Sequence, residues 1–144
     1  MSRPVKITLW VVAGLLVGFA AIQLVPYGRD HTNPPVTAEP AWDSPRTREL
    51  ATQACFDCHS NETTWPWYSN IAPVSWLVYH DVIEARDRMN FSEWGRPHPG
   101  IDQVIEEIEE GGMPLPQYLL MHPNARLSVQ EREALIEGLR KSLQ

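Results

Sequence analysis

Apolar residues form one long run near the N-terminus, followed by shorter segments in which they recur with a helical period. The run covers residues 7–25 and contains no charged side chain. About 20 mostly apolar residues are enough for a helix to cross roughly 30 Å of hydrocarbon, so this run predicts one membrane-spanning helix. Arg3 and Lys6 precede it, and basic residues favour the cytoplasmic side. Everything after Pro26 is therefore expected outside the cytoplasmic membrane.

A cleaved signal peptide is the alternative interpretation of this run. The apolar region of a signal peptide normally spans about 7–15 residues and ends at a small-residue cleavage site. Residues 18–20, Gly-Phe-Ala, could form such a site, but the apolar run continues to Val25. The length favours an uncleaved anchor, and under either interpretation the rest of the chain is exported.

The rest of the chain shows helical periodicity and no strand-like alternation of any length, which predicts an all-helical domain. Ser44 is a good N-cap, and Pro45 suits the first helical position. Residues 128–131, Ser-Val-Gln-Glu, fit a capping box at the start of a helix. Gly111 and Gly112 are expected to end the helix before them. The four expected helices run from 44 to the cysteine motif, from about 73 to 89, from 101 to 108 and from 128 to 143.

Composition divides the exported part into two regions. Residues 26–43 hold four prolines and no helical period, which predicts an extended, semi-rigid linker between the anchor (1–25) and the helical domain (44–144). The exported part has 18 acidic against 10 basic residues, a formal charge of −8. Nucleic acids and anionic membrane surfaces attract basic patches, so this charge argues against both as partners. The acidic residues of 106–110 are interpreted as a solvated helix face.

One motif carries specific chemistry. Cys55, Cys58 and His59 form a C-x-x-C-H sequence, which is typical of covalent (c-type) haem attachment. Two thiols three positions apart at a helix end can reach the two vinyl groups on one porphyrin edge, and the next residue places an imidazole under the iron. Because thioether bonds hold the cofactor permanently, a small domain can keep one haem without a deep pocket.

Three other roles for the cysteine pair have weaker support. A redox dithiol is expected in a βαβ context, which the sequence lacks. A structural zinc site needs four ligands, and His80, His98 and His122 are scattered singly. A disulfide is compatible with export, but the loop it would close is too short to stabilise much. The chain has only two cysteines and both belong to the motif, which favours haem.

A c-type haem usually takes a second axial ligand, commonly a methionine, whose thioether favours ferrous iron. Met113 is the best placed, because it follows two glycines and precedes Pro114 and Pro116 on a stiff, non-helical segment. It lies 54 positions after His59, which is enough chain to reach the other haem face. The remaining candidates are Met89, Met121, His122 and, more weakly, His80.

The segment after the motif is rich in aromatic residues. Trp65, Trp67 and Tyr68 stand close together, and Trp76 and Trp94 follow. Aromatic side chains dominate core burial in general, so ordinary packing accounts for them. A second interpretation, compatible with the first, is that some of them cover the porphyrin or donate hydrogen bonds to its propionates.

The residues around the motif resemble the bacterial haem-binding domain family, small c-type cytochrome-like proteins that often carry an N-terminal membrane anchor. The similarity begins with residues 54–69 (ACFDCHSNETTWPWYS), continues through 71–76 and 90–94, and extends to the final helix. It covers about residues 29–140. The resemblance implies a cytochrome c-like, all-helical domain around one covalent haem, in which the first and last helices pack across each other.

The resemblance also implies roles for individual residues. Cys55 and Cys58 would attach the haem, His59 would be the proximal iron ligand, and Met113 would be the sixth ligand. The carbonyl of Pro73 would accept a hydrogen bond from the proximal imidazole, a contact that fixes the ring. Pro73 is therefore grouped with the aromatic residues Trp65, Trp67 and Tyr68 as the haem environment.

The leading functional hypothesis is one-electron transfer on the periplasmic face of a bacterial inner membrane, with a redox partner protein that the sequence does not identify. No Ser-His-Asp arrangement or phosphate-binding glycine loop suggests an enzyme. The alternative is a haem-based gas or peroxide sensor, or a peroxidase-like enzyme. That alternative needs an open or displaceable sixth position, because distal access decides between ligand activation and electron transfer. A third hypothesis is a haem-bearing assembly subunit.

Overall fold

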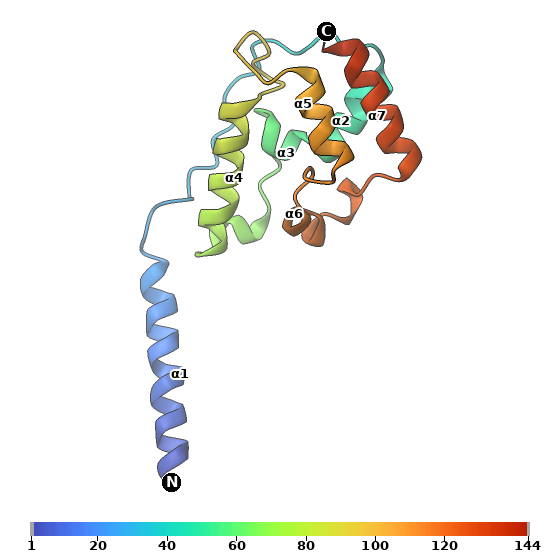
Figure 1. Cartoon of the computed structure of the whole chain (residues 1–144). Helices are drawn as coiled ribbons and strands as arrows, with labels where there is room; N and C mark the ends of the chain where they lie inside the picture. Colours follow the sequence, from blue (N-terminus) through green and yellow to red (C-terminus); the bar gives the residue numbers. More distant parts are fainter. Residues whose placement is uncertain (1, 144) are drawn as a thin grey trace. The chain divides into compact units, whose positions relative to one another are not determined.

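The computed structural model describes residues 2–143, and within this range all regular secondary structure is helical, apart from one isolated bridge between Ala38 and Glu93. An all-helical fold with one N-terminal apolar helix is what the sequence predicts, and the structure confirms it (Figure 1). The α-helices are α1 (Arg3–Ile22), α2 (Pro45–Ala54), α3 (Phe56–His59), α4 (Val74–Arg88), α5 (Ile101–Glu109), α6 (Pro116–Met121) and α7 (Val129–Ser142), and two 3₁₀ turns are η1 (Trp67–Asn70) and η2 (Pro123–Ala125).

The chain forms two compact units. The first unit contains Met1–His31 together with Trp65–Asp81, and the second contains Thr32–Thr64 together with Val82–Gln144. In the first unit, α1 buries none of its side chains and is long and apolar enough to cross a membrane. The cysteine motif and the hydrophobic core belong to the second unit.

Local signals set most of the helix ends. Ser44 Oγ accepts a hydrogen bond from the backbone N–H of Thr47 at the start of α2. At the start of α7, Ser128 and Glu131 form the capping box that the sequence predicts. Gly111, after α5, has a φ of 75°, a left-handed conformation that suits glycine. The expected helices are therefore confirmed, whereas α6 and the two 3₁₀ turns had no periodic signal.

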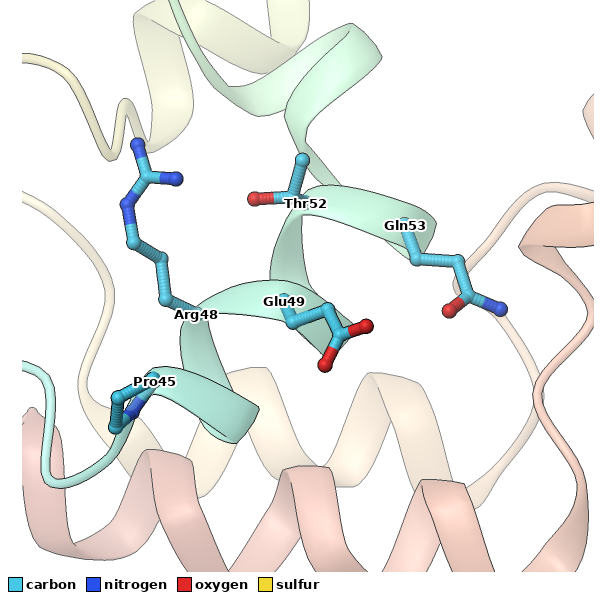
Figure 2. Close-up of a pocket in the computed structure, with 5 residues that line it drawn as sticks. All are labelled: Pro45, Arg48, Glu49, Thr52 and Gln53. Carbon is cyan, nitrogen blue, oxygen red and sulfur yellow. The ribbon is translucent and has the colours of Figure 1, made fainter.

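Helix α2 has one buried face and one outer face. Its buried residues include Leu50, Ala51 and Ala54; Ala54 lies four positions after Leu50 and three after Ala51, as on one helix face. The outer face borders an open hollow (Figure 2), which contains no member of the cysteine motif. The hollow is lined by Pro45, Arg48, Glu49, Thr52 and Gln53.

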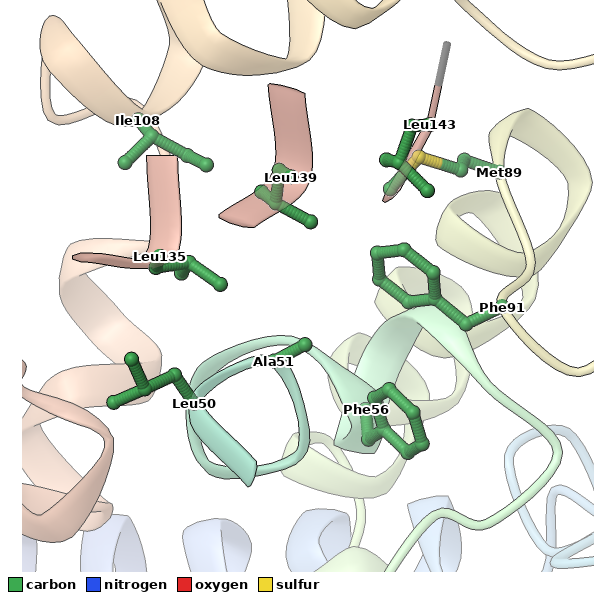
Figure 3. Close-up of a cluster of buried hydrophobic side chains, with 9 residues drawn as sticks. All are labelled: Leu50, Ala51, Phe56, Met89, Phe91, Ile108, Leu135, Leu139 and Leu143. Carbon is green, nitrogen blue, oxygen red and sulfur yellow. The ribbon is translucent and has the colours of Figure 1, made fainter. Parts of the chain in front are cut away.

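The core of the second unit forms where α2 and α7 cross (Figure 3). Gly138 of α7 lies against Thr47 of α2 so closely that an added Cβ would stand 2.6 Å from Thr47 Cγ2. The first and last helices of the domain thus pack across each other, as the resemblance implies. The core consists of Leu50, Ala51, Phe56, Met89, Phe91, Ile108, Leu135, Leu139 and Leu143.

Residues 32–43, the later part of the expected linker, belong to the second unit. The backbone N–H groups of Thr37 and Ala38 both donate to the carbonyl of Ser92, at 2.9 and 3.1 Å. Trp42 packs against the core, with its ring centroid 5.4 Å from that of Phe91. Residues 32–43 are therefore extended, as their prolines predict, but they form part of a packed unit instead of a free spacer.

Candidate functional site

The cysteine motif occupies the junction between two helices. Cys55 ends α2, with its N–H donating to the carbonyl of Ala51, and its own carbonyl accepts from the N–H groups of Cys58 and His59. Residues 56–59 thus form a single turn of helix, α3. This turn brings the two cysteines and His59 into one short segment, as the motif predicts.

Two backbone contacts fix His59. Its ring Nδ1 lies 3.0 Å from the carbonyl oxygen of Met89, and its own carbonyl accepts a hydrogen bond from the N–H of Phe91 at 2.8 Å. A carbonyl can only accept, so Nδ1 carries the proton and Nε2 keeps its lone pair. Burial lowers the pKa of His59, and the carbonyls of Met89 and Ala85 act in the opposite direction. A neutral imidazole with Nε2 available is the form that ligates a metal.

This contact corrects one implication of the resemblance. Pro73 was expected to accept the bond from the imidazole, but the acceptor in the structure is the carbonyl of Met89, at the end of α4. A backbone carbonyl is equally effective whichever residue carries it, because it holds the ring orientation and raises the basicity of the opposite nitrogen. The placement of Pro73 in the haem environment stays a prediction.

The Cys55 side chain is a thiol whose pKa is raised to about 12, first by burial and then by the neighbouring Cys58. Deprotonation is therefore suppressed, and the group stays neutral at physiological pH. Within residues 2–143, no group of three or more His, Cys, Asp or Glu side chains comes together as a metal site would require. The donor set of two adjacent thiols and one neutral imidazole fits a covalently attached haem better than zinc.

A buried arginine holds the chain just after the motif. The Arg86 side chain is only 7% exposed, and its Nε donates to the carbonyl of Ser60 at 2.8 Å. Its Nη2 donates to Thr63 Oγ1 at 2.8 Å and to Asn33 Oδ1 at the same distance. Because a buried guanidinium needs several acceptors, this side chain orders residues 60–63 directly after His59.

Buried amides and hydroxyls complete the support on that side of the motif. Ser92 Oγ accepts from the N–H of Asn61 at 2.9 Å, and Asn90 Nδ2 donates to Asn61 Oδ1 at 2.8 Å. Ser60 Oγ in turn donates to the carbonyl of Phe56 at 2.7 Å. The turn that follows α4 and the turn that follows α3 therefore hold each other through side chains.

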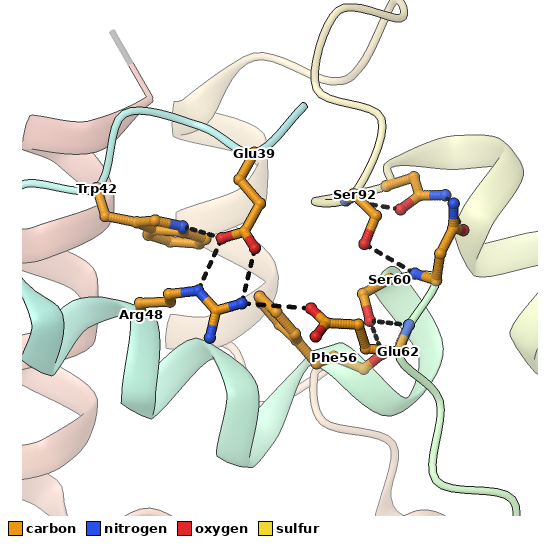
Figure 4. A network of polar contacts seen from close by, with 9 residues as sticks. Glu39, Trp42, Arg48, Phe56, Ser60, Glu62 and Ser92 are labelled. Carbon is orange, nitrogen blue, oxygen red and sulfur yellow. Dashed lines mark hydrogen bonds and ion pairs between the residues drawn. The ribbon is translucent and has the colours of Figure 1, made fainter. Parts of the chain in front are cut away.

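Figure 4 shows a second network, on the side of Phe56. Two guanidinium nitrogens of Arg48, Nε and Nη2, donate to the Glu39 carboxylate at 2.7 Å, and the guanidinium carbon lies 5.2 Å from the Phe56 ring centroid. The Arg48 bond is the largest cause that lowers the pKa of Glu39, with a further bond from Trp42. Arg48 also reaches Glu62 at 3.3 Å. The aromatic residue inside the motif is thus covered by an ion pair from α2 and the 32–43 segment.

Asp57 links the motif to α6. Its Oδ2 accepts a hydrogen bond from the Tyr118 hydroxyl at 2.7 Å, while Oδ1 accepts from the N–H of Thr64 at 3.0 Å. Burial, followed by this bond to Asp57, raises the pKa of Tyr118, so the phenol stays a donor. The Tyr118 ring stacks on His122 with centroids 4.0 Å apart. Helix α6 is therefore attached directly to the C-x-x-C-H turn.

Met113 lies on the non-helical segment that the sequence predicts, between α5 and α6. Its N–H donates to the carbonyl of Glu107 at 3.0 Å, and its side chain is 36% exposed. Tyr118, whose hydroxyl bonds to the motif, lies five positions after Met113. The chain is therefore held at Met113 itself and again at Tyr118, while Met113 is partly exposed.

The other expected ligand candidates have different surroundings. The Met89 side chain is buried in the core beside Leu143, and only its carbonyl serves His59 (Figure 3). Met121 is 57% exposed, and His122 Nδ1 bonds to the carbonyl of Tyr118 at 3.0 Å. His98 stacks on Trp94 with centroids 3.9 Å apart, and His80 is exposed.

The aromatic residues expected near the haem belong to the first unit. Trp65 stacks on His31 with centroids 4.4 Å apart, and Trp67 is 73% exposed. Trp67 and Tyr68 meet edge to face. Their role beside the cofactor stays a prediction, as does that of Pro73.

Asp57, Tyr118 and Arg86 support the site, and sequence reasoning missed them. Asp57 and Tyr118 lie 61 positions apart, so no local spacing connects them. In the sequence, Arg86 looks like any charged residue on the solvent-exposed face of a helix. The one available signal was the position of Asp57 inside the motif, where any carboxylate must find a donor once α3 packs against the domain.

Comparison with known proteins gives one positive finding. The model of a family described as the haem-binding domain matches residues 17–141, which is most of the chain. Comparisons with curated proteins and with solved structures returned no match.

Proposed function

Because the chain belongs to the haem-binding domain family, we propose that Cys55 and Cys58 hold one haem through thioether bonds and that His59 ligates its iron. The contact between His59 Nδ1 and the Met89 carbonyl carries this proposal. It leaves Nε2 as the nitrogen with a lone pair, on a ring whose orientation the backbone fixes. The two thiols stand within one helical turn of that ring.

We propose Met113 as the second axial ligand. Its thioether is partly accessible, and the segment that carries it is anchored at both ends, to Glu107 of α5 and through Tyr118 to Asp57. An anchored segment is needed because an axial thioether bond is weak and holds only where the chain positions the sulfur in advance. Met89 is unsuitable because its side chain fills the core.

These ligands support one-electron transfer as the function. When bound, haem supplies a one-electron couple at its iron, and a methionine ligand favours the ferrous state. The chain contributes a fixed neutral imidazole, a second ligand and buried surroundings, which keep the geometry similar in both oxidation states. Helix α1, with Arg3 and Lys6 at its N-terminal end, would hold this domain on the periplasmic side of a bacterial inner membrane.

The test is optical spectroscopy of the full chain, produced in a host that matures c-type cytochromes and purified in detergent. Wild type is compared with Met113→Ala and with Met121→Ala, a matched control because Met121 is more exposed than Met113. We expect covalent, low-spin haem in wild type and in the control, with the long-wavelength iron–thioether charge-transfer band. The Met113→Ala protein should lose that band and bind carbon monoxide rapidly when ferrous.

Other outcomes would change the conclusion in defined ways. A wild-type protein that is already high-spin has an open sixth position, which would replace electron transfer by the sensor or peroxidase-like function. Loss of the band in Met121→Ala instead of Met113→Ala would move the distal ligand to α6. Absence of covalent haem under these conditions would overturn the proposal for Cys55 and Cys58.

A further inference from the structure

The first unit joins the end of α1 to a segment far along the chain. Gln23, the residue that follows α1, donates from Nε2 to the carbonyl of Ala72 at 2.9 Å, and its Oε1 accepts from the N–H of Ala72 at 2.9 Å. This reciprocal pair satisfies both polar backbone groups of Ala72. Residues next to Ala72 therefore lie at the same level as the C-terminal end of α1.

Two more contacts make this junction tight. Gly28 has a φ of 76°, and a Cβ added to it would stand 2.6 Å from the carbonyl oxygen of Ser75, so only glycine allows the approach. The Tyr27 and Tyr79 rings meet edge to face with centroids 5.3 Å apart. The segment after α1 thus packs directly on the beginning of α4.

Apolar side chains are exposed on the segment around Ala72. They are Trp67, Ile71, Val74 and Leu77, here called the 67–77 patch, with exposures of 73%, 37%, 43% and 50%. Ile71 and Val74 are within two residues of Ala72, a reach of about 8 Å at 3.8 Å per residue. Leu24, Val25 and Tyr27 of the preceding segment are exposed beside the same junction.

The composition of this segment differs from the rest of the exported chain. Residues 63–80 contain no Asp, Glu, Lys or Arg, although the exported part as a whole has a formal charge of −8. They contain four tryptophans and tyrosines besides Trp67. Trp and Tyr are enriched where a membrane protein meets the lipid headgroups, since their rings are amphipathic. A segment without charged side chains can approach the headgroups at no cost in desolvation of its own charges.

We propose that the 67–77 patch is inserted in the headgroup region of the membrane that α1 crosses, so that the lipid surface is its partner. The proposal rests on the membrane anchoring stated above. The charge-free run of 7–25 is about as long as the hydrocarbon is thick, and Gln23 is close to its outer end, so the Gln23–Ala72 pair lies near the boundary between hydrocarbon and headgroups. The membrane then covers apolar side chains that the chain itself leaves exposed.

The test places the haem-loaded full chain in phosphatidylcholine vesicles with a small share of a lipid that carries a photoreactive diazirine near its headgroup. The vesicles are washed with alkaline carbonate, irradiated, and the protein is digested for mass spectrometry. Peptides covering 65–80 should be labelled at least about tenfold more than the α7 peptide, although α7 also exposes an apolar residue, Val129.

Two variants sharpen the test. Trp67→Ser with Leu77→Ser should reduce the labelling of 65–80 at least about threefold, whereas Leu120→Ser with Val129→Ser, equally exposed apolar residues of the second unit, should leave it unchanged. Label on α1 but not on 65–80 would overturn this inference and leave the anchor intact. Release by carbonate would instead refute the anchor. If the patch is not labelled and Trp67→Ser alters the haem spectrum, the patch contacts the haem instead of the membrane.

Discussion

The crossing of α2 and α7 makes Gly138 the most demanding position in the domain. An alanine Cβ there would stand 2.6 Å from Thr47 Cγ2 and 2.9 Å from Thr47 Cβ, and would also meet Oγ1. Real carbon atoms do not approach so closely, so one side must move. Thr47 cannot turn aside, because both branches of its side chain are involved and Oγ1 donates to Asp43 Oδ1 at 2.5 Å. Thr47 is also buried, with 3% exposure.

Two opposing effects determine how much Gly138→Ala changes the free energy of unfolding. Overpacking a close-packed site costs about 1–3 kcal/mol, and the rigid neighbour places this site in the upper half of that range. Replacing glycine by alanine inside a helix stabilises the helix by about 1 kcal/mol. The free energy of unfolding should therefore fall by about 1–2 kcal/mol. For a domain of this size that corresponds to a decrease in Tm of about 5–15 °C.

The assay is unfolding of the haem-loaded full chain in detergent, followed by far-UV circular dichroism and haem absorption. Gly95→Ala is the control, since an added Cβ there meets nothing within 4 Å, and its effect should stay within about 0.5 kcal/mol. Combining Gly138→Ala with Thr47→Ala removes the two clashing branches and should recover about 1 kcal/mol relative to additivity. A Gly138→Ala protein as stable as wild type would refute the close crossing.

Two further predictions concern the networks around the motif. Tyr118→Phe keeps the stacking on His122 but removes the donor to Asp57, so unfolding should become easier by about 1.5–3 kcal/mol, and carbon monoxide should bind faster to the ferrous protein because α6 is less firmly attached. An unchanged rate would show that this bond does not position the Met113 segment. Glu39→Gln tests the pH dependence of stability. The pKa of Glu39 is lowered, chiefly by the hydrogen bond from Arg48. The stabilisation by its carboxylate is therefore complete above the ordinary pKa of 4.5 and is lost as the pH falls through the lowered value. The Tm difference between wild type and Glu39→Gln should be largest near pH 7 and shrink towards about pH 3, and a constant difference would contradict it.

Local signals in the sequence predicted the long helices but not the short ones. Capping residues and apolar spacing identified α2, α4, α5 and α7, since these helices are long enough to show a period. Helix α6 has only six residues and begins at a proline, so it shows no period. Proline content predicted the extended backbone of residues 32–43, but composition does not reveal which surface an extended segment covers.

The sequence predicts the reactive residues of the candidate site but not the residues that hold them in place. Cys55, Cys58 and His59 follow from a five-residue motif, whose spacing is itself the chemical requirement. The partner of the imidazole is a backbone carbonyl, and every residue has one, so residue type carries no signal for Met89. The Tyr118–Asp57 bond spans 61 positions and depends on tertiary packing alone.

The buried polar residues are concentrated around the candidate site. Of the ten buried polar residues in the described range, six lie either just after His59 or at the end of α4 and the turn behind it; they are Ser60, Asn61, Thr63, Arg86, Asn90 and Ser92. A buried donor or acceptor that loses its partner costs about 1–3 kcal/mol, so these bonds allow only one register between the two turns. The same register sets the Met89 carbonyl opposite His59 Nδ1. The orientation of the imidazole therefore depends on these buried polar contacts as well as on the motif itself.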